Sequence, residues 1–123
     1  MTTINYGGRR FRGVVNYDDG DLTRETLFAY HQEGSIVWGE CAGGGVAHGF
    51  LVGTVGDDEV LTLLWQYVSH DGRLVGGTCV SRPEVLADGR LRLHEEWAVT
   101  LGGTQKGRSV IEEVPHRAGQ PRI

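Results

Sequence analysis

Glycine-centred turn signals recur at roughly even spacing along this 123-residue chain. Glycine, Asp and Asn supply the positive φ angles that tight hairpins require. Seven such signals divide the chain into about eight short segments, a pattern typical of an antiparallel β-sandwich or β-barrel. The signals are Asp18-Asp19-Gly20, Glu33-Gly34, Gly43-Gly44-Gly45, Gly56-Asp57-Asp58, Asp71-Gly72, Asp88-Gly89 and Gly102-Gly103.

The segments between these turns alternate in side-chain character with a period of two, which predicts β-strands. No segment shows a convincing helical spacing, so we expect little helix, apart from one helical turn within 23–28. Each of four segments places one set of residues on a common face. These sets are Phe28, Tyr30 and Gln32; Leu61, Leu63, Trp65 and Tyr67; Gly77, Cys79 and Ser81; and Ser109, Ile111 and Glu113.

Short hairpins that join successive strands predict an up-and-down meander. Closing about eight such strands into a barrel removes the sticky edges of an open sheet. We therefore predict an all-β fold, a single up-and-down antiparallel β-barrel of about eight strands. The whole chain, 1–123, is expected to be one domain, with the barrel over 9–114 and a C-terminal tail over 115–123.

Composition and charge exclude several classes of partner. A net charge of -4 argues against nucleic acid, because phosphate binding relies on clustered Lys and Arg. No apolar run approaches the roughly 20 residues needed to span a bilayer, and the N-terminus lacks signal-peptide features. Cys41 and Cys79 stand alone, without zinc or redox spacing. We expect a cytoplasmic protein with two free thiols, no cofactor, and neither a membrane nor a nucleic-acid partner.

The densest group of reactive side chains lies in the segment Leu91–Val99. Strand alternation places Glu95 and Trp97 on the inner face, and His94 and Glu96 on the outer face. A carboxyl group in an apolar interior is the setting of a general acid or base. Glu95, with Tyr30, is therefore the candidate catalytic group. Two alternatives remain open: Glu95 orients a ligand, or it belongs to a structural hydrogen-bond network.

The inward positions also include glycines, namely Gly49, Gly53 and Gly77, and the list extends to Gly39 if the alternation continues along its segment. Missing side chains favour a lumen that is left partly open; the alternative is that the glycines relieve crowding opposite Trp65 and Trp97. Aromatic walls with a few polar groups are typical of small-molecule pockets, although a filled core would look similar. The candidate ligand-binding residues are Phe28, Gln32, Trp65, Tyr67, Cys79, Ser81, Trp97 and Ser109.

The outward residues suggest less chemistry. His94 and Glu96 have no histidine partner that spacing identifies, so we predict no metal site. Trp38 and Phe50 are expected on the outer face, where they could form an apolar patch for homodimerisation.

Five stretches together suggest a family: Phe28–Gly34, Gly43-Gly44 with Gly49 and Gly53, Gly77–Glu84, Leu93–Trp97 and Gly107–Glu113. They resemble a group of small bacterial proteins that are often labelled N-acetylglutamate synthase. The resemblance covers most of Arg10–Glu113, and it implies a compact β-barrel. An acetyltransferase needs a strand–helix arm to hold the coenzyme A pyrophosphate, and the predicted strands supply no such helix, so no activity is carried over. By architecture the chain is similar to calycin-like barrels that hold one lipophilic ligand.

Three functional hypotheses follow. The first is binding of a small, largely apolar molecule in the lumen, oriented by a buried carboxylate. The second is an enzyme of the isomerase, cyclase or hydratase type that uses Glu95 as acid or base. The third is a non-catalytic structural or homodimerising protein.

Overall fold

The computed structural model describes residues 4–16 and 20–115, and these residues form eight strands and no helix. None of the described segments is a helix that could cross a membrane. The predicted tail lies outside the described residues from 116 onward. The strands are β1 (Arg10–Val15), β2 (Leu27–Glu33), β3 (Ile36–Gly43), β4 (Val46–Val55), β5 (Leu61–Ser69), β6 (Leu74–Val85), β7 (Leu91–Leu101) and β8 (Lys106–Glu113).

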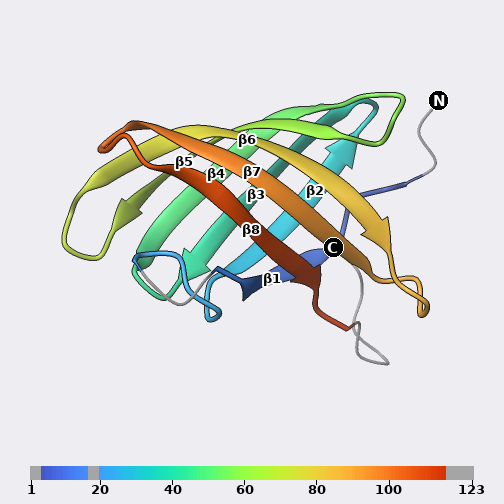
Figure 1. Ribbon diagram of the computed structural model, residues 1–123, viewed down its shortest axis with the longest axis horizontal. Helices are drawn as coiled ribbons and strands as arrows, with labels where there is room; N and C mark the ends of the chain where they lie inside the picture. The colour runs from blue at the N-terminus through green and yellow to red at the C-terminus, as the bar shows by residue number, and fades with distance from the viewer. Residues whose placement is uncertain (1–3, 17–19, 116–123) are drawn as a thin grey trace.

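The strands form one closed antiparallel barrel in chain order (Figure 1). Each strand pairs with the next, and β1 closes the barrel against β8, with Phe11 opposite Glu113. The predicted all-β, up-and-down barrel is confirmed, because each turn signal in the described residues falls at a hairpin. Within 23–28 the structure has one hydrogen-bonded turn and no helix: the Thr26 N–H donates to the Thr23 carbonyl over 3.0 Å, and β2 follows at once.

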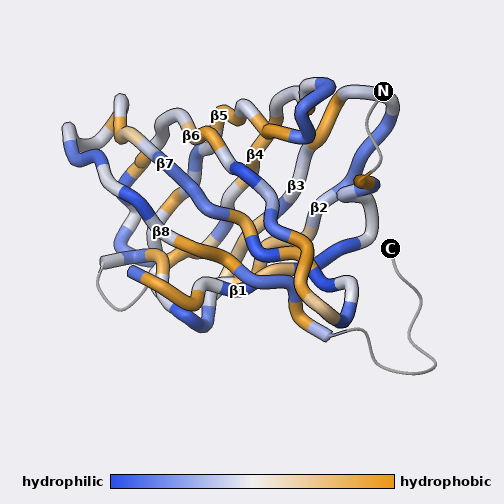
Figure 2. Tube along the Cα trace, turned by 45° about the vertical axis from the view of Figure 1, so that its right-hand side comes forward, coloured by the Kyte–Doolittle hydropathy of each residue, from blue (hydrophilic) through white to orange (hydrophobic). Residues whose placement is uncertain are grey.

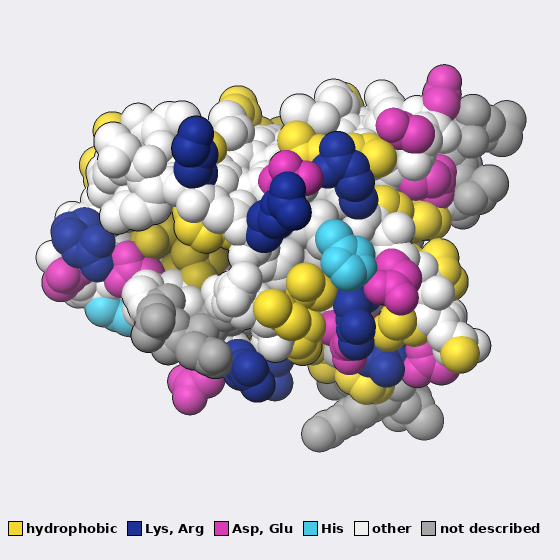
Figure 3. Space-filling view, in the orientation of Figure 1, with side chains coloured by type: hydrophobic (Ala, Val, Ile, Leu, Met, Phe, Trp, Pro, Cys, Tyr) yellow, Lys and Arg dark blue, Asp and Glu magenta, His cyan; other side chains and the backbone are white. Residues whose placement is uncertain are grey.

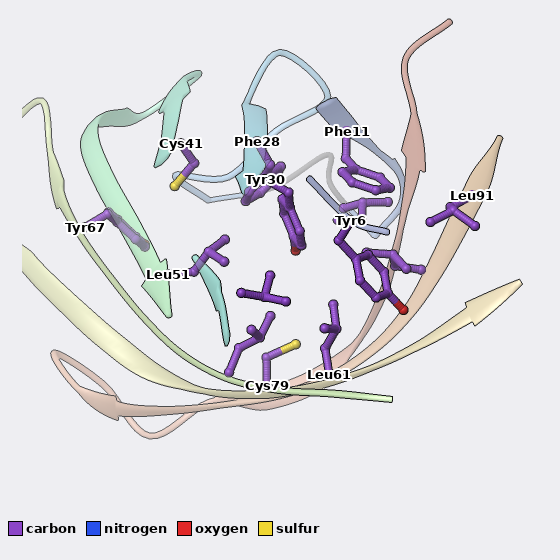
Figure 4. Packing of buried hydrophobic residues seen from close by; sticks show 14 of the residues in the cluster. Tyr6, Phe11, Phe28, Tyr30, Cys41, Leu51, Leu61, Tyr67, Cys79 and Leu91 are labelled. Atoms are coloured by element: carbon purple, nitrogen blue, oxygen red, sulfur yellow. The ribbon is translucent and has the colours of Figure 1, made fainter. Parts of the chain in front are cut away.

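Hydropathy alternates along the strands, so that one face of the sheet lines the barrel (Figure 2). The inward apolar residues of all eight strands join one buried cluster. In Figure 4, Tyr30 and Cys79 project from opposite walls toward the interior. The Phe11 ring packs against that of Tyr30, with ring centroids 4.9 Å apart. The core of the protein is thus the barrel lumen itself.

The two ends of the barrel differ. One end, which we name the closed end, carries the β2–β3, β4–β5 and β6–β7 hairpins and is crossed by residues 4–9. Tyr6 from this segment is fully buried, and its hydroxyl donates to the Glu59 carbonyl over 2.6 Å. The pKa of Tyr6 is raised, chiefly by burial. The opposite end, named the open end, carries the β1–β2, β3–β4, β5–β6 and β7–β8 hairpins.

An ion-pair network ties the strands together at the closed end. Glu113 is buried, and its carboxylate accepts from Arg9 Nη1 over 2.7 Å and from the Leu91 N–H over 3.1 Å. Glu112 lies beside it on the outer side and pairs with Arg90 and Arg92. These contacts join the N-terminal segment, β7 and β8, and so seal the end that Tyr6 fills.

Candidate ligand-binding site

A cavity of about 450 Å³ lies inside the barrel and reaches the open end. Its deep part is walled by inward residues of β2 to β8, and its mouth by residues of three open-end hairpins. A volume of this size is within the range of small-molecule pockets. The inner walls include Phe28, Tyr30, Cys41, Leu51, Leu63, Trp65, Tyr67, Val75, Cys79, Glu95, Trp97, Val99 and Ser109; the mouth includes Asn16, Asp21, Leu22, Arg73 and Gln105.

A row of polar side chains crosses the wall that β6, β7 and β8 form. Ser81, Glu95 and Ser109 are direct neighbours in the strand register. The Ser109 hydroxyl donates to Glu95 Oε1 over 3.0 Å, and the Cys79 thiol lies 3.9 Å from Glu95 Oε2. Glu95 is 8% exposed and lines the cavity. A carboxylate in this position can accept hydrogen bonds from the wall and from a molecule in the cavity.

Two indole rings form the aromatic walls, and each lies over a glycine of the next strand. Trp65 is opposite Gly77, and Trp97 is opposite Gly107. A Cβ at Gly77 would stand 2.7 Å from Trp65 Cζ2, and one at Gly107 would stand 2.9 Å from Trp97 Cζ2. The glycines therefore let each indole lie flat against the sheet.

The space beside the other inward glycines shows whether they leave room in the lumen. A Cβ at Gly49 would stand 2.5 Å from Cys41 Sγ, and one at Gly53 would stand 1.9 Å from the Thr62 carbonyl oxygen. Neighbouring atoms therefore already occupy the space beside these glycines. The expectation that glycines vacate the lumen is wrong at these positions, and relief of crowding is what they provide.

The mouth is shaped by the β1–β2 connection, which folds back over the open end. Asp21 accepts a hydrogen bond from the Tyr67 hydroxyl over 2.9 Å. It also forms an ion pair with Arg73 over 2.8 Å. Its carbonyl also accepts from the Gly45 N–H over 2.7 Å. Burial and the bond to Asp21 raise the pKa of Tyr67, so the phenol stays protonated and keeps donating. The connection is thus tethered at the mouth to β5 and to the β3–β4 and β5–β6 hairpins.

Both thiols are held in their neutral form. Burial raises the pKa of Cys41 to about 11. Burial, followed by the nearby Glu95 carboxylate, raises the pKa of Cys79 to about 12. The thiolate is the reactive form of cysteine, so neither side chain is equipped as a nucleophile at neutral pH.

A family model described as avidin-like protein matches residues 4–114. The chain belongs to this avidin-like family. Its members are small calycin-like β-barrels that bind small ligands within the barrel. Neither the curated proteins nor the solved structures yield a match to this chain. This family is not the one expected from the sequence motifs. The match gives no support to the N-acetylglutamate synthase label.

The avidin-like barrel brings most of the predicted site residues to one cavity. Phe28, Tyr30, Trp65, Tyr67, Cys79, Glu95, Trp97 and Ser109 all line it. Ser81 shares the inward face with Cys79 but is fully buried and does not line the cavity; its hydroxyl lies 3.4 Å from Cys79 Sγ. Gln32 lies apart from the lining, near the closed end, where its side chain accepts from the Tyr6 N–H over 2.8 Å. Gln32 does not line the cavity, because the cavity extends along β2 only as far as Tyr30 and does not reach the closed end.

Sequence patterns missed the mouth of this avidin-like barrel. Asp21 and Arg73 lie in separate hairpins, 52 positions apart, and meet because both hairpins project from the same end. Nothing local in either hairpin signals the pairing. Gly107 was not among the predicted inward glycines, because the residue that stands opposite Trp97 is known only from the strand register.

The outer face of β6, β7 and β8 carries paired charges, as Figure 3 shows for the face turned to the viewer. His94 and Glu96 project outward, as predicted. His94 Nε2 lies 2.8 Å from Glu84 Oε1, and Glu96 pairs with Arg82 over 3.1 Å. Among residues 4–16 and 20–115, no group of three His, Cys, Asp or Glu side chains is placed to hold a metal ion.

Proposed function

We propose that this avidin-like barrel binds one small, largely apolar molecule in its lumen and that Glu95 orients the molecule's polar end. The observation that carries the proposal is a carboxylate at the wall of a 450 Å³ cavity whose remaining walls are mostly aromatic and aliphatic. Apolar walls with few polar groups supply affinity through burial, while the polar groups fix orientation.

Blocking the lumen tests the proposal. Val75 is buried at the cavity wall, and its neighbour Leu74 points outward and is exposed. Val75→Phe should fill part of the cavity, whereas Leu74→Phe adds the same ring outside. The measurement is titration with the neutral fluorescent dye N-phenyl-1-naphthylamine. Wild type and Leu74→Phe should bind the dye and Val75→Phe should not; equal binding by all three would place the dye elsewhere and contradict the proposal.

The same carboxylate supports a second candidate, an acid–base enzyme of the isomerase, cyclase or hydratase type. Glu95 and Tyr30 both line the cavity, so both could contact a bound substrate. Glu95→Gln preserves shape and removes the acid or base, so turnover should fall by about 10²–10⁴-fold while binding persists. Turnover that survives this change would exclude Glu95 as the acid or base.

A homodimer is a further proposal, and it rests on the outer face of β3, β4 and β5. Trp38, Val52 and Leu64 lie opposite one another across these strands, all exposed. Phe50 and Ile36 extend this apolar row. A row of exposed large apolar residues is a common mark of an association surface, and avidin-like proteins often form oligomers. Light scattering should give a dimer that Val52→Lys converts to a monomer, with Val85→Lys as the control elsewhere.

A further inference from the structure

The cavity has an uneven distribution of charge. Among its described lining residues the charged side chains are Asp21, Arg73 and Glu95. Arg73 contacts Asp21 at the mouth and also donates to Asp71 over 3.2 Å. Arg73, the positively charged side chain among these lining residues, is therefore already paired with two carboxylates at the mouth. Deeper in the cavity the lining holds the Glu95 carboxyl group, together with neutral donors such as Ser109.

A carboxylate removed from water loses hydration that a neutral hydroxyl replaces in part. The bond from Ser109 to Glu95 Oε1 supplies one such replacement. A positive group in the cavity would be attracted to this carboxylate at short range. An anionic group would instead meet Glu95 at short range in a poorly screened interior.

The aromatic walls favour the same sign of charge. Trp65 and Tyr67 stack with ring centroids 6.1 Å apart, and Trp97 stands on β7 beside Glu95 in the cavity lining. The face of an aromatic ring attracts a cation, and tryptophan does so most strongly. A carboxylate that lines the same cavity as these rings is therefore suited to an organic ammonium group attached to an apolar body.

We propose that the ligand of this site is an organic cation, a protonated amine or amidine on a flat apolar body, whose charged end contacts Glu95. This inference rests on the proposed function, since it assigns a ligand class to the same cavity. It accounts for the buried carboxylate, the aromatic walls and the pairing of Arg73 with acidic side chains at the rim. The apolar body would fill the space between Trp65 and Trp97, toward the mouth.

A series of probes that share one ring system tests the sign of the charge. Tryptamine is a cation at pH 7, tryptophol is neutral, and indole-3-propionate is an anion. Each probe is titrated against wild-type protein loaded with N-phenyl-1-naphthylamine, and displacement is followed. Tryptamine should bind at least about 10-fold more tightly than tryptophol, as expected for one charged hydrogen bond. The anion should bind most weakly.

Two variants locate the effect. Glu95→Gln should bring tryptamine and tryptophol to within about twofold of each other, because the carboxylate charge is the source of the preference. Glu96→Gln removes an outward carboxylate from the adjacent position and should leave the preference unchanged. The wild-type series alone decides the sign if Glu95→Gln fails to fold.

The outcomes separate this inference from the proposed function. If tryptophol or indole-3-propionate binds as tightly as tryptamine, or if tryptamine fails to displace the dye, the cation assignment is overturned while lumen binding stands. If the dye itself does not enter the lumen, the proposed function fails and the assignment fails with it. A preference for tryptamine that persists in Glu95→Gln would also overturn it, because the charge would then lie elsewhere.

Discussion

Ser109 and Glu95 face each other directly across β7 and β8, and the serine hydroxyl donates to Glu95 Oε1 over 3.0 Å. Both side chains are buried and both line the cavity. Because the hydroxyl is held by the strand register, it fixes the orientation of the carboxylate before any ligand arrives. Preorganisation of this kind lowers the ordering cost of binding.

Ser109→Ala should lower the free energy of unfolding by about 1–2 kcal/mol, because Glu95 stays buried and loses a donor. Urea denaturation at pH 7 measures the change. A double-mutant cycle with Glu95→Gln provides the control, since the two changes should be less than additive if they act through one bond. Full additivity would show that the hydroxyl and the carboxylate are independent.

Tyr67→Phe should loosen the tether between the β1–β2 connection and the mouth. The ring would keep its packing against Trp65 but lose the 2.9 Å bond to Asp21. We expect the dissociation rate of N-phenyl-1-naphthylamine to rise about two- to tenfold, the effect of one lost hydrogen bond. Stopped-flow fluorescence measures this rate.

Tyr6→Phe is the matched control, because it removes a tyrosine hydroxyl bond at the closed end. It should lower stability while leaving the dissociation rate of the dye unchanged. Equal acceleration in both variants would argue that global opening, and not the mouth, controls release.

Gly77→Ala and Gly107→Ala should differ in severity. A Cβ at Gly77 would stand 2.0 Å from the Ala98 carbonyl oxygen, which the sheet holds in place. A Cβ at Gly107 meets the outer edge of the Trp97 indole, which can move. We expect losses of about 2–3 kcal/mol for Gly77→Ala and about 1 kcal/mol for Gly107→Ala.

Guanidinium denaturation measures these two losses, and near-ultraviolet circular dichroism should report the displaced indole in Gly107→Ala. Gly72→Ala serves as a turn control, because its φ of +84° imposes strain without any contact in the lumen. An unchanged spectrum in Gly107→Ala would mean that Trp97 does not depend on the glycine.

Glu112 should contribute pH-dependent stability at the closed end. Hydrogen bonds from Arg92 and then Arg90 lower the pKa of Glu112 below its usual value of 4.5. A carboxylate whose pKa is lowered by folding stabilises the protein fully above its unfolded pKa, and the contribution is lost as pH falls through the folded value. Glu112→Gln should therefore cost about 1 kcal/mol at pH 7, and the difference from wild type should shrink below about pH 4.5.

Urea denaturation of both proteins between pH 3 and 7 tests this expectation. Glu84→Gln is the control, because Glu84 contacts His94 and carries no arginine partner in the described contacts. A Glu112→Gln difference that grows on acidification would reverse the expected sign and contradict the assignment.

The sequence by itself determined the architecture and the faces of the strands. Evenly spaced glycine turns set the number of hairpins, and alternation placed Trp65, Cys79, Glu95 and Ser109 inside. Both signals are local, since a turn depends on a few φ angles and a strand face on a period of two. The antiparallel order of the strands also followed from the sequence, because a short hairpin can join two neighbouring strands only when they run in opposite directions.

Tertiary structure alone decided where along the barrel the site lies. Gln32 shares a face with Phe28 and Tyr30, yet it contacts Tyr6 at the closed end, because the N-terminal segment fills that end. Asp21 and Arg73 meet through two hairpins that alternate turns bring to the same mouth. Periodicity reports which way a side chain points, whereas depth in the lumen and contacts between hairpins depend on the register and closure of all eight strands.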